Sequence, residues 1–133
     1  FGLLPAMTVT VRVIATKTVG AGEGVSYGYL YRTTKKSNLA LCALGYADGI
    51  DRHACGGAVV WHNGSFYPIA GRVAMDAFML DMGDTVVSEG DVVTLFGDPA
   101  FGPQSPDAWA QSLGKNGSEV VAAIGPRVPR SYQ

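Results

Sequence analysis

The segment GVSYGYLYR, residues 24–32, carries phenol groups at Tyr27, Tyr29 and Tyr31. A phenol can donate or accept a proton, so one of these tyrosines could be a working acid/base group. Alternate residues of a β-strand face the same side, and the pattern therefore predicts a strand with three phenols along one face. Aromatic residues are common in strands, so the alternation alone favours a structural stripe over a catalytic group.

Other residue types that could do chemistry are sparse. His53 and His62 are the two histidines, and neither stands at a metal-ligand spacing from Cys42 or Cys55. His53 and Cys55 share one loop, but two ligands are too few for a structural zinc site, and we expect no metal. The sequence also lacks a phosphate-binding Walker loop and a nucleophile elbow. No complete active site therefore follows from these residues alone.

The composition is that of one folded domain. The 133 residues are enough for a single core, and 47% hydrophobic with 16% charged residues argues against disorder. A net charge of −1 gives no basic surface for nucleic acid or an anionic membrane, so we expect neither as a partner. Cys42 lies in the apolar run LALCALGY and is expected to be a buried reduced thiol, which favours a cytoplasmic location.

Short strands separated by glycines fill the first two thirds of the chain. In MTVTVRVIAT, residues 7–16, Val9, Val11 and Val13 alternate with polar residues and predict a half-buried strand. Asn63-Gly64 predicts the turn of a hairpin over residues 58–71. Further strands are expected within residues 39–46, 72–82 and 86–97.

Two short helices are expected near the C-terminus. Ser105-Pro106-Asp107 has the chemistry of a helix start, and Gly114 that of a helix end. A second helix is predicted over residues 118–124. The predicted fold class is therefore mainly β, a closed or partly closed small β-barrel with two short helices near the C-terminus.

Four motifs in order make the chain resemble the C-terminal domain of alanine racemase over nearly its whole length. They are VSYG at residues 25–28, LGYADG at 44–49, GRVAMD at 71–76 and PRVPRSY at 126–132. The resemblance implies a preceding (β/α)₈ barrel that holds pyridoxal 5'-phosphate on a lysine, and two chains paired head to tail. We therefore expect residues 1–133 to be the C-terminal β-domain, with residues 1–7 the end of a connection from a barrel missing from this sequence.

The resemblance also implies roles for individual residues. Tyr27 matches the second acid/base, opposite the cofactor lysine, because racemisation needs one proton-transfer group on each face of the α-carbon. The main-chain amide at Met75 matches the group that binds the substrate carboxylate. The residues that match the substrate entrance are Tyr46, Arg52, Arg72 and Asp76.

Structural alternatives accompany these roles. Met75 could fill the core, as methionine usually does, and the two arginines could form surface or inter-domain salt bridges. Tyr29 and Tyr31 keep the structural interpretation. A free phenol ionises near ~10, so a tyrosine base at neutral pH needs nearby cations or hydrogen-bond donors. The sequence places no histidine or arginine beside Tyr27, and we expect these groups to come from the opposing barrel.

One segment departs from the family pattern. The family usually has a tyrosine directly before a glutamate, in a segment like GTIxYE, and that phenol contacts the cofactor phosphate. The corresponding stretch here is GKNGSE, with Ser118 before Glu119. Ser118 could offer a shorter hydroxyl to the phosphate, or it could serve as a helix N-cap. Ala74 also replaces a cysteine that often precedes the family's methionine.

The function implied by the resemblance is that of the C-terminal domain of a pyridoxal-phosphate-dependent alanine racemase, which interconverts L- and D-alanine for peptidoglycan precursors. Its expected partners are alanine and the barrel domains of its own chain and of a second subunit. The isolated chain is expected to be inactive and to hold no cofactor. Two alternatives stay open: a non-catalytic β-barrel binding module of the same shape, and an amino-acid racemase of broader specificity.

Overall fold

The computed structural model describes residues 2–133, so Phe1, the first residue of the expected connection, lies outside it. Eight strands, two α-helices and three short 3₁₀ turns follow one another along the chain. The strands are β1 (Val9–Val19), β2 (Gly24–Val25), β3 (Tyr31–Arg32), β4 (Ser37–Cys42), β5 (Val59–His62), β6 (Ser65–Pro68), β7 (Phe78–Asp81) and β8 (Val92–Phe96). The helices are α1 (Pro106–Ser112) and α2 (Gly117–Ala123), and the 3₁₀ turns are Tyr27–Tyr29, Tyr46–Asp48 and Pro99–Phe101. None of the helices within residues 2–133 is long and apolar enough to cross a membrane.

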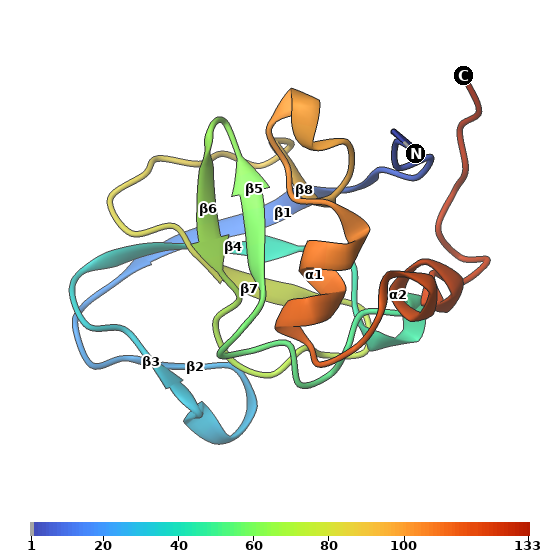
Figure 1. Cartoon of the computed structure of the whole chain (residues 1–133). Coiled ribbons are helices and arrows are strands. Elements are labelled where there is room, and N and C mark those ends of the chain that lie inside the picture. Colours follow the sequence, from blue (N-terminus) through green and yellow to red (C-terminus); the bar gives the residue numbers. More distant parts are fainter. Residues whose placement is uncertain (1) are drawn as a thin grey trace.

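Six strands form one antiparallel sheet that curls into a barrel (Figure 1). Their order is β6-β5-β8-β1-β4-β7, so β6 and β7 are the two edges. A single bridge between Ile69 and Leu80 joins these edges, and the Ala70 N–H donates to the Met79 carbonyl at 2.9 Å beside it. The barrel is therefore nearly closed, which confirms the predicted mainly β fold with two short helices.

The long strand β1 lies in the middle of the sheet, between β8 and β4. Its first half pairs with β8 and its second half with β4. The register shifts between Val13 and Ala15, and an irregularity of this kind lets one strand bend and serve two neighbours. Val9, Val11 and Val13 are buried, as their alternation predicts.

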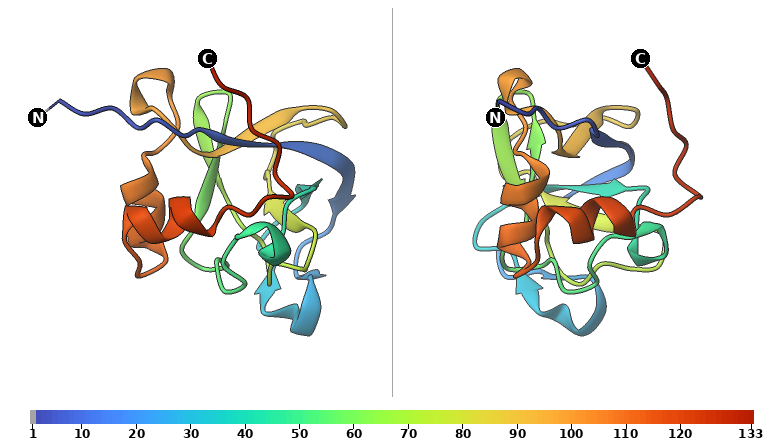
Figure 2. Two further views of the ribbon diagram at one scale, coloured as in Figure 1. Left: turned by 90° about the vertical axis from the view of Figure 1, so that its right-hand side faces the viewer. Right: turned by 45° about the vertical axis from the view of Figure 1, so that its right-hand side comes forward.

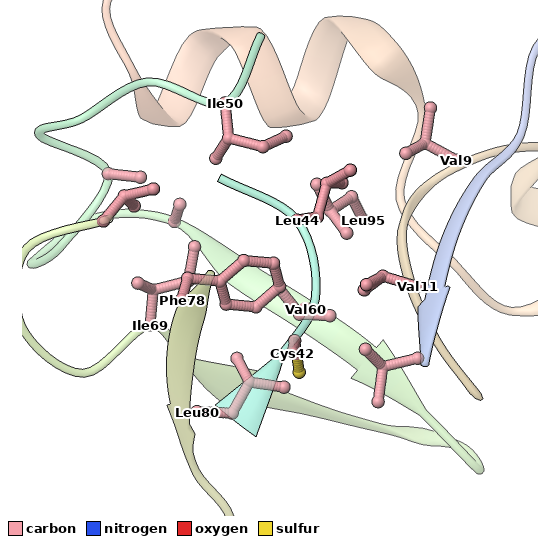
Figure 3. Close-up of a cluster of buried hydrophobic side chains, with 14 of the residues drawn as sticks. Val9, Val11, Cys42, Leu44, Ile50, Val60, Ile69, Phe78, Leu80 and Leu95 are labelled. Atoms are coloured by element: carbon pink, nitrogen blue, oxygen red, sulfur yellow. The ribbon is translucent and has the colours of Figure 1, made fainter. Parts of the chain in front are cut away.

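The core fills the barrel interior with buried hydrophobic side chains from β1, β4, β5, β7 and β8, and half-buried Tyr67 of β6 packs against it. Figure 3 shows Phe78, Leu80 and Val60 pointing into this space with Cys42 nearby. Helix α1 covers one end of the barrel, where Trp109 packs against Phe96 with ring centroids 6.3 Å apart. Helix α2 packs against α1 and adds Val120 to the same core (Figures 1 and 2).

The predicted continuous strand over residues 24–32 is wrong. The chain forms the short pair β2 and β3 with the 3₁₀ turn Tyr27–Tyr29 between them, and this unit projects from the barrel (Figure 2). Ser26 (φ 63°), Gly28 (φ 72°) and Tyr29 (φ 48°) adopt positive φ, which reverses the chain. The three phenols therefore do not share one strand face.

Two other predicted elements are shorter or shifted. In the segment 72–82 only Phe78–Asp81 is a strand, and the preceding residues form a loop. Helix α2 begins at Gly117 with Asn116 as its N-cap, because the Asn116 side-chain oxygen accepts from the Glu119 N–H at 3.0 Å. Ser118 is therefore in the first helical turn, and its interpretation as an N-cap is wrong.

Tyr31 ties the projecting unit to the barrel. Its hydroxyl donates to Asp81 Oδ2 at 2.7 Å, which links β3 to β7 across the structure. Burial, followed by the hydrogen bond with the Asp81 carboxylate, raises the pKa of Tyr31 to about 12. The protonated phenol is thus the form that the fold holds, in agreement with the structural interpretation of this tyrosine.

The two cysteines should differ sharply in reactivity. Burial raises the pKa of Cys42 to about 12, so roughly one thiol in ten thousand is ionised at pH 8. Cys55 is free and only partly buried. We expect a thiol reagent to modify Cys55 and spare Cys42 in the native protein, and to modify both after denaturation, as measured by peptide mass spectrometry. Equal native rates would contradict the buried position of Cys42.

Tyr31 should make the fold sensitive to alkali. An unfolded phenol ionises near ~10 and the folded Tyr31 near about 12, so the unfolded state loses its proton first. The stabilisation is complete below pH ~10 and falls as the pH rises towards 12. Tyr31→Phe should lower stability by about 1 kcal/mol at pH 7 and flatten its decline between pH 10 and 12. Denaturant unfolding measures both effects, with Tyr132→Phe, at a 91% exposed phenol, as the control.

Candidate functional site

Three loops meet at a shallow pocket of about 290 Å³ at one end of the barrel. The lining residues are Tyr27, Tyr46, Arg52, Val73, Ala74 and Met75. They come from the turn between β2 and β3, from the segment after β4, and from the loop before β7. The structure therefore brings together four of the residues singled out from the sequence: Tyr27, Tyr46, Arg52 and Met75.

A hydrogen bond to the loop before β7 fixes the main chain beside Tyr27. The Ser26 hydroxyl donates to the Arg72 carbonyl at 2.7 Å, and this contact holds a residue whose positive φ is unfavourable for an L-amino acid. Gly71 makes room for it, because a Cβ at Gly71 would lie 2.5 Å from Ser26 Cβ. Tyr27 itself is 68% exposed, so its hydroxyl is accessible from outside the domain.

The Tyr46 turn lies directly against the Met75 segment. The N–H groups of Tyr46 and Ala47 donate to the carbonyls of Ala74 and Met75, each at 3.0 Å. This pairing requires glycine at position 45, because a Cβ there would lie 2.3 Å from the Met75 carbonyl oxygen. These main-chain hydrogen bonds thus hold the two segments in register.

The main chain of Met75 has one hydrogen-bonding group free and one in use. The Met75 carbonyl is used by Ala47, but its N–H donates no hydrogen bond to any atom of residues 2–133. An unpaired N–H at a pocket wall is a ready donor for a carboxylate. The Met75 side chain is 53% exposed, so the core-filling alternative is wrong.

Arg52 supplies positive charge to the same pocket. Its guanidinium lies over the Tyr46 ring, 6.0 Å from the ring centroid, in cation–π geometry. The sequence places no arginine beside Tyr27 along the chain, but the fold places Arg52 in the pocket that Tyr27 lines. This chain therefore contributes one cation, Arg52, to the pocket that Tyr27 lines.

The other expected entrance residues stand outside the pocket lining. Arg72 precedes Val73, and its Nε is buried without a hydrogen-bond partner among residues 2–133. Asp76 follows Met75 and pairs with Arg127, whose Nη2 lies 2.6 Å from Asp76 Oδ1. Asp76 is thus engaged in an ion pair rather than directed at the pocket.

Ser118 lies apart from this pocket. It is exposed on the first turn of α2 and lines a separate hollow formed with the N-terminal segment and the start of α1. The structure therefore does not bring Ser118 together with Tyr27 or Met75.

Two paired residues outside the pocket lining were not singled out from the sequence. Arg127 and Asp48 form an ion pair of 3.0 Å, and Asp48 is buried. Both belong to motifs that carry the family resemblance, PRVPRSY and LGYADG, and the acid in the second motif was taken only as turn chemistry. Their ion pair joins residues far apart in the sequence, so no local sequence pattern could have revealed it.

The pocket fits one face of a cofactor site rather than a complete cradle. It offers a phenol, an unpaired main-chain N–H and a guanidinium, which suit an anionic ligand. None of its lining residues from the described part of the chain is a lysine, the residue type that forms the covalent link to pyridoxal phosphate. The residues present can therefore bind and protonate a ligand that is held from the other side.

Gly45→Ala should separate the Tyr46 turn from the Met75 segment. The added Cβ meets main-chain atoms that cannot turn away, so we expect a loss of about 2 kcal/mol in the free energy of unfolding. Thermal and denaturant unfolding measure it. Gly20→Ala is the matched control, because a Cβ there meets nothing within 4 Å, and it should leave stability nearly unchanged. Equal stability of the two variants would contradict the close approach at Gly45.

The chain matches a known family along almost its whole length. The family model described as "Alanine racemase, C-terminal domain" matches residues 6–132. An alanine racemase of Salinispora tropica is 50% identical over 133 residues, which is 99% of this chain and 36% of that protein. One of Frankia casuarinae is 50% identical over 132 residues, covering 99% of this chain and 34% of that protein. The chain thus spans about a third of the length of these relatives.

Solved structures agree with the sequence matches. The alanine racemase of D-cycloserine-producing Streptomyces lavendulae superposes with a TM-score of 0.95 at 44% identity, over 99% of this chain and 35% of that one. The Bacillus anthracis alanine racemase gives a TM-score of 0.92 at 38% identity, over 100% of this chain and 34% of that one. With the family model matched over residues 6–132, the chain belongs to the alanine racemase C-terminal domain family.

Proposed function

We propose that this domain completes the active site of a pyridoxal-phosphate-dependent alanine racemase. In this proposal Tyr27 is the acid/base group on one face of the substrate α-carbon, and the Met75 N–H anchors the substrate carboxylate. Residues 1–133 form the C-terminal domain, with residues 1–7 leading from a preceding barrel domain. Interconversion of L- and D-alanine would supply D-alanine for peptidoglycan in the cytoplasm.

One observation carries the proposal: Tyr27 and Met75, whose main-chain N–H is unpaired within residues 2–133, line the same pocket. A racemase must hold the carboxylate still while a proton leaves one face of the α-carbon and another arrives on the opposite face. A main-chain N–H is a rigid anchor, and a tyrosine hydroxyl beside it can deliver or accept the proton. Arg52, which stacks on Tyr46, adds positive charge for the carboxylate.

The cofactor supplies the remaining chemistry. Pyridoxal phosphate, when bound, acts as the electron sink that makes the α-proton of an amino acid removable. Tyr27 would hold or move the proton at its Oη on one side, and the family's cofactor lysine serves the other. Met75 and Arg52 would orient the substrate between them. A separate hollow contains Ser118, so its contact with the cofactor phosphate would require the phosphate to reach α2.

An opposing surface is needed to close this site. Tyr27 is 68% and Met75 53% exposed, so water has free access to both in the domain alone. Proton transfer to carbon is favoured where water is excluded. We propose that the barrel domain of a second subunit, paired head to tail, covers the pocket, and that the isolated domain is inactive.

Relatives support a small amino-acid ligand. The Bacillus anthracis alanine racemase was solved with bound L-Ala-P, and that of Clostridium difficile in complex with cycloserine. Both proteins match this chain over at least 98% of its length. A pocket of about 290 Å³ with one carboxylate anchor and a phenol is compatible with alanine, the smallest chiral amino acid.

Tyr27→Phe in the full-length enzyme tests the acid/base role. Loss of one proton-transfer group should lower racemisation by roughly 10²- to 10⁴-fold. In D₂O the variant should still exchange the α-proton of one enantiomer, through the base on the opposite face, without inverting it. Chiral chromatography and mass spectrometry measure inversion and exchange.

Tyr29→Phe is the matched control, because it removes a phenol that is 63% exposed on the same turn. It should leave racemisation close to wild type. Full activity of Tyr27→Phe would contradict the acid/base role and indicate that the domain is a non-catalytic scaffold. Racemisation of larger amino acids at rates equal to alanine would instead indicate a broader-specificity enzyme.

A further inference from the structure

Two carboxylates from the segments that line the pocket share one cation. Arg127 Nε lies 3.0 Å from Asp48 Oδ1, and Arg127 Nη2 lies 2.6 Å from Asp76 Oδ1. The Asp48 side chain is 6% exposed, and a buried carboxylate requires a charged or hydrogen-bonding partner. Arg127 therefore neutralises Asp48 and at the same time holds Asp76. We call this unit the Arg127 bridge.

Each carboxylate belongs to a segment that lines the pocket. Asp48 ends the turn that begins with Tyr46, and its second oxygen accepts from the Gly45 N–H at 3.0 Å. Asp76 directly follows Met75. The Arg127 bridge thus joins the turn that carries Tyr46 to the loop that carries the unpaired Met75 N–H.

The loop depends on this bridge at its apex. At its base the Ala74 N–H donates to the Ala77 carbonyl at 2.8 Å, and Met75 and Asp76 lie between these residues. The carbonyls of Ala74 and Met75 are held by the Tyr46 turn, but the Asp76 side chain is held by Arg127. Without Arg127 the exposed end of the loop loses its side-chain tether.

The segment that carries Arg127 is itself anchored to the Tyr46 turn. After α2, the Gly125 N–H donates to the Asp48 carbonyl at 3.0 Å, and the Val128 N–H donates to the Gly125 carbonyl at 3.2 Å. The backbone segment that carries the Arg127 guanidinium is therefore already hydrogen-bonded to the Asp48 main chain. This geometry gives the bridge a fixed end from which to hold Asp76.

We propose that Arg127 is a positioning residue that fixes the Met75 N–H for carboxylate binding. The inference rests on the proposed function of this pocket and adds a residue to it. Arg127 acts through Asp76 and need not touch the substrate. Its removal would also leave two unpaired carboxylates beside an anion-binding N–H, where like charges disfavour the bound carboxylate.

Arg127→Gln in the full-length enzyme should separate binding from proton transfer. The KM for alanine should rise about tenfold, within the ~100-fold that a 1 Å misplacement can cause, while kcat stays within about twofold. Lys35→Gln is the control, since it breaks the exposed 3.0 Å ion pair with Asp84 and should leave both constants unchanged. An unchanged KM in Arg127→Gln would overturn the proposal.

A double-variant cycle distinguishes the bridge from a general loss of stability. Asp76→Asn alone should also raise KM, because it frees the loop apex from Arg127. The double variant Arg127→Gln/Asp76→Asn should be no worse than the more impaired single variant, since both substitutions remove the same Arg127–Asp76 interaction. Effects on KM that simply multiply would show that the two residues act independently, against the proposal.

Hydrogen exchange tests the bridge without any need for activity. In full-length Arg127→Gln, peptides that contain Gly45 to Ala47 and Ala74 to Ala77 should exchange their main-chain protons faster than in wild type. Lys35→Gln should leave these peptides unchanged. If the wild-type enzyme does not racemise alanine, the proposed function fails. The hydrogen-exchange comparison still tests the Arg127 bridge in that case. Exchange at the wild-type rate in Arg127→Gln would overturn it.

Discussion

The close main-chain contact at Gly45 is the constraint on which the rest of the pocket depends. Only a residue without a Cβ lets the Tyr46 turn approach the Met75 carbonyl, and two 3.0 Å hydrogen bonds then fix the two segments together. This pairing uses the carbonyls of Ala74 and Met75 and leaves the Met75 N–H free. The proposed carboxylate-binding N–H is therefore left free by the way in which the two loops are joined.

The phenol reaches the pocket by a different construction. Tyr27 stands on a turn that projects from the barrel, and its backbone passes through positive φ at Ser26 and Tyr29. Hydrogen bonds from Ser26 to the Arg72 carbonyl and from Tyr31 to Asp81 hold this turn in place. One part of the pocket thus rests on main-chain pairing and the other on side-chain tethers.

The fold was largely readable from local patterns, and the site was not. The buried alternation of Val9, Val11 and Val13 and the Asn63-Gly64 hairpin are short-range signals, and both are confirmed. The strand prediction for the tyrosine segment was wrong because propensity favours a strand there, whereas the side chains of Ser26 and Tyr31 donate hydrogen bonds to distant residues that hold the backbone in a turn. The pocket residues could be named only through the family resemblance. The pair of Arg127 with Asp76, 51 positions apart, has no local pattern at all.

The proposed use of a main-chain N–H at Met75 has a consequence for how substitutions at this position act. A side-chain contact can be lost by a single substitution, but every residue except proline retains this donor. A ligand that accepts a hydrogen bond there would therefore address a feature that most point mutations at position 75 leave intact. Because Met75 is 53% exposed, other side chains can replace it here while the proposed main-chain anchor is retained.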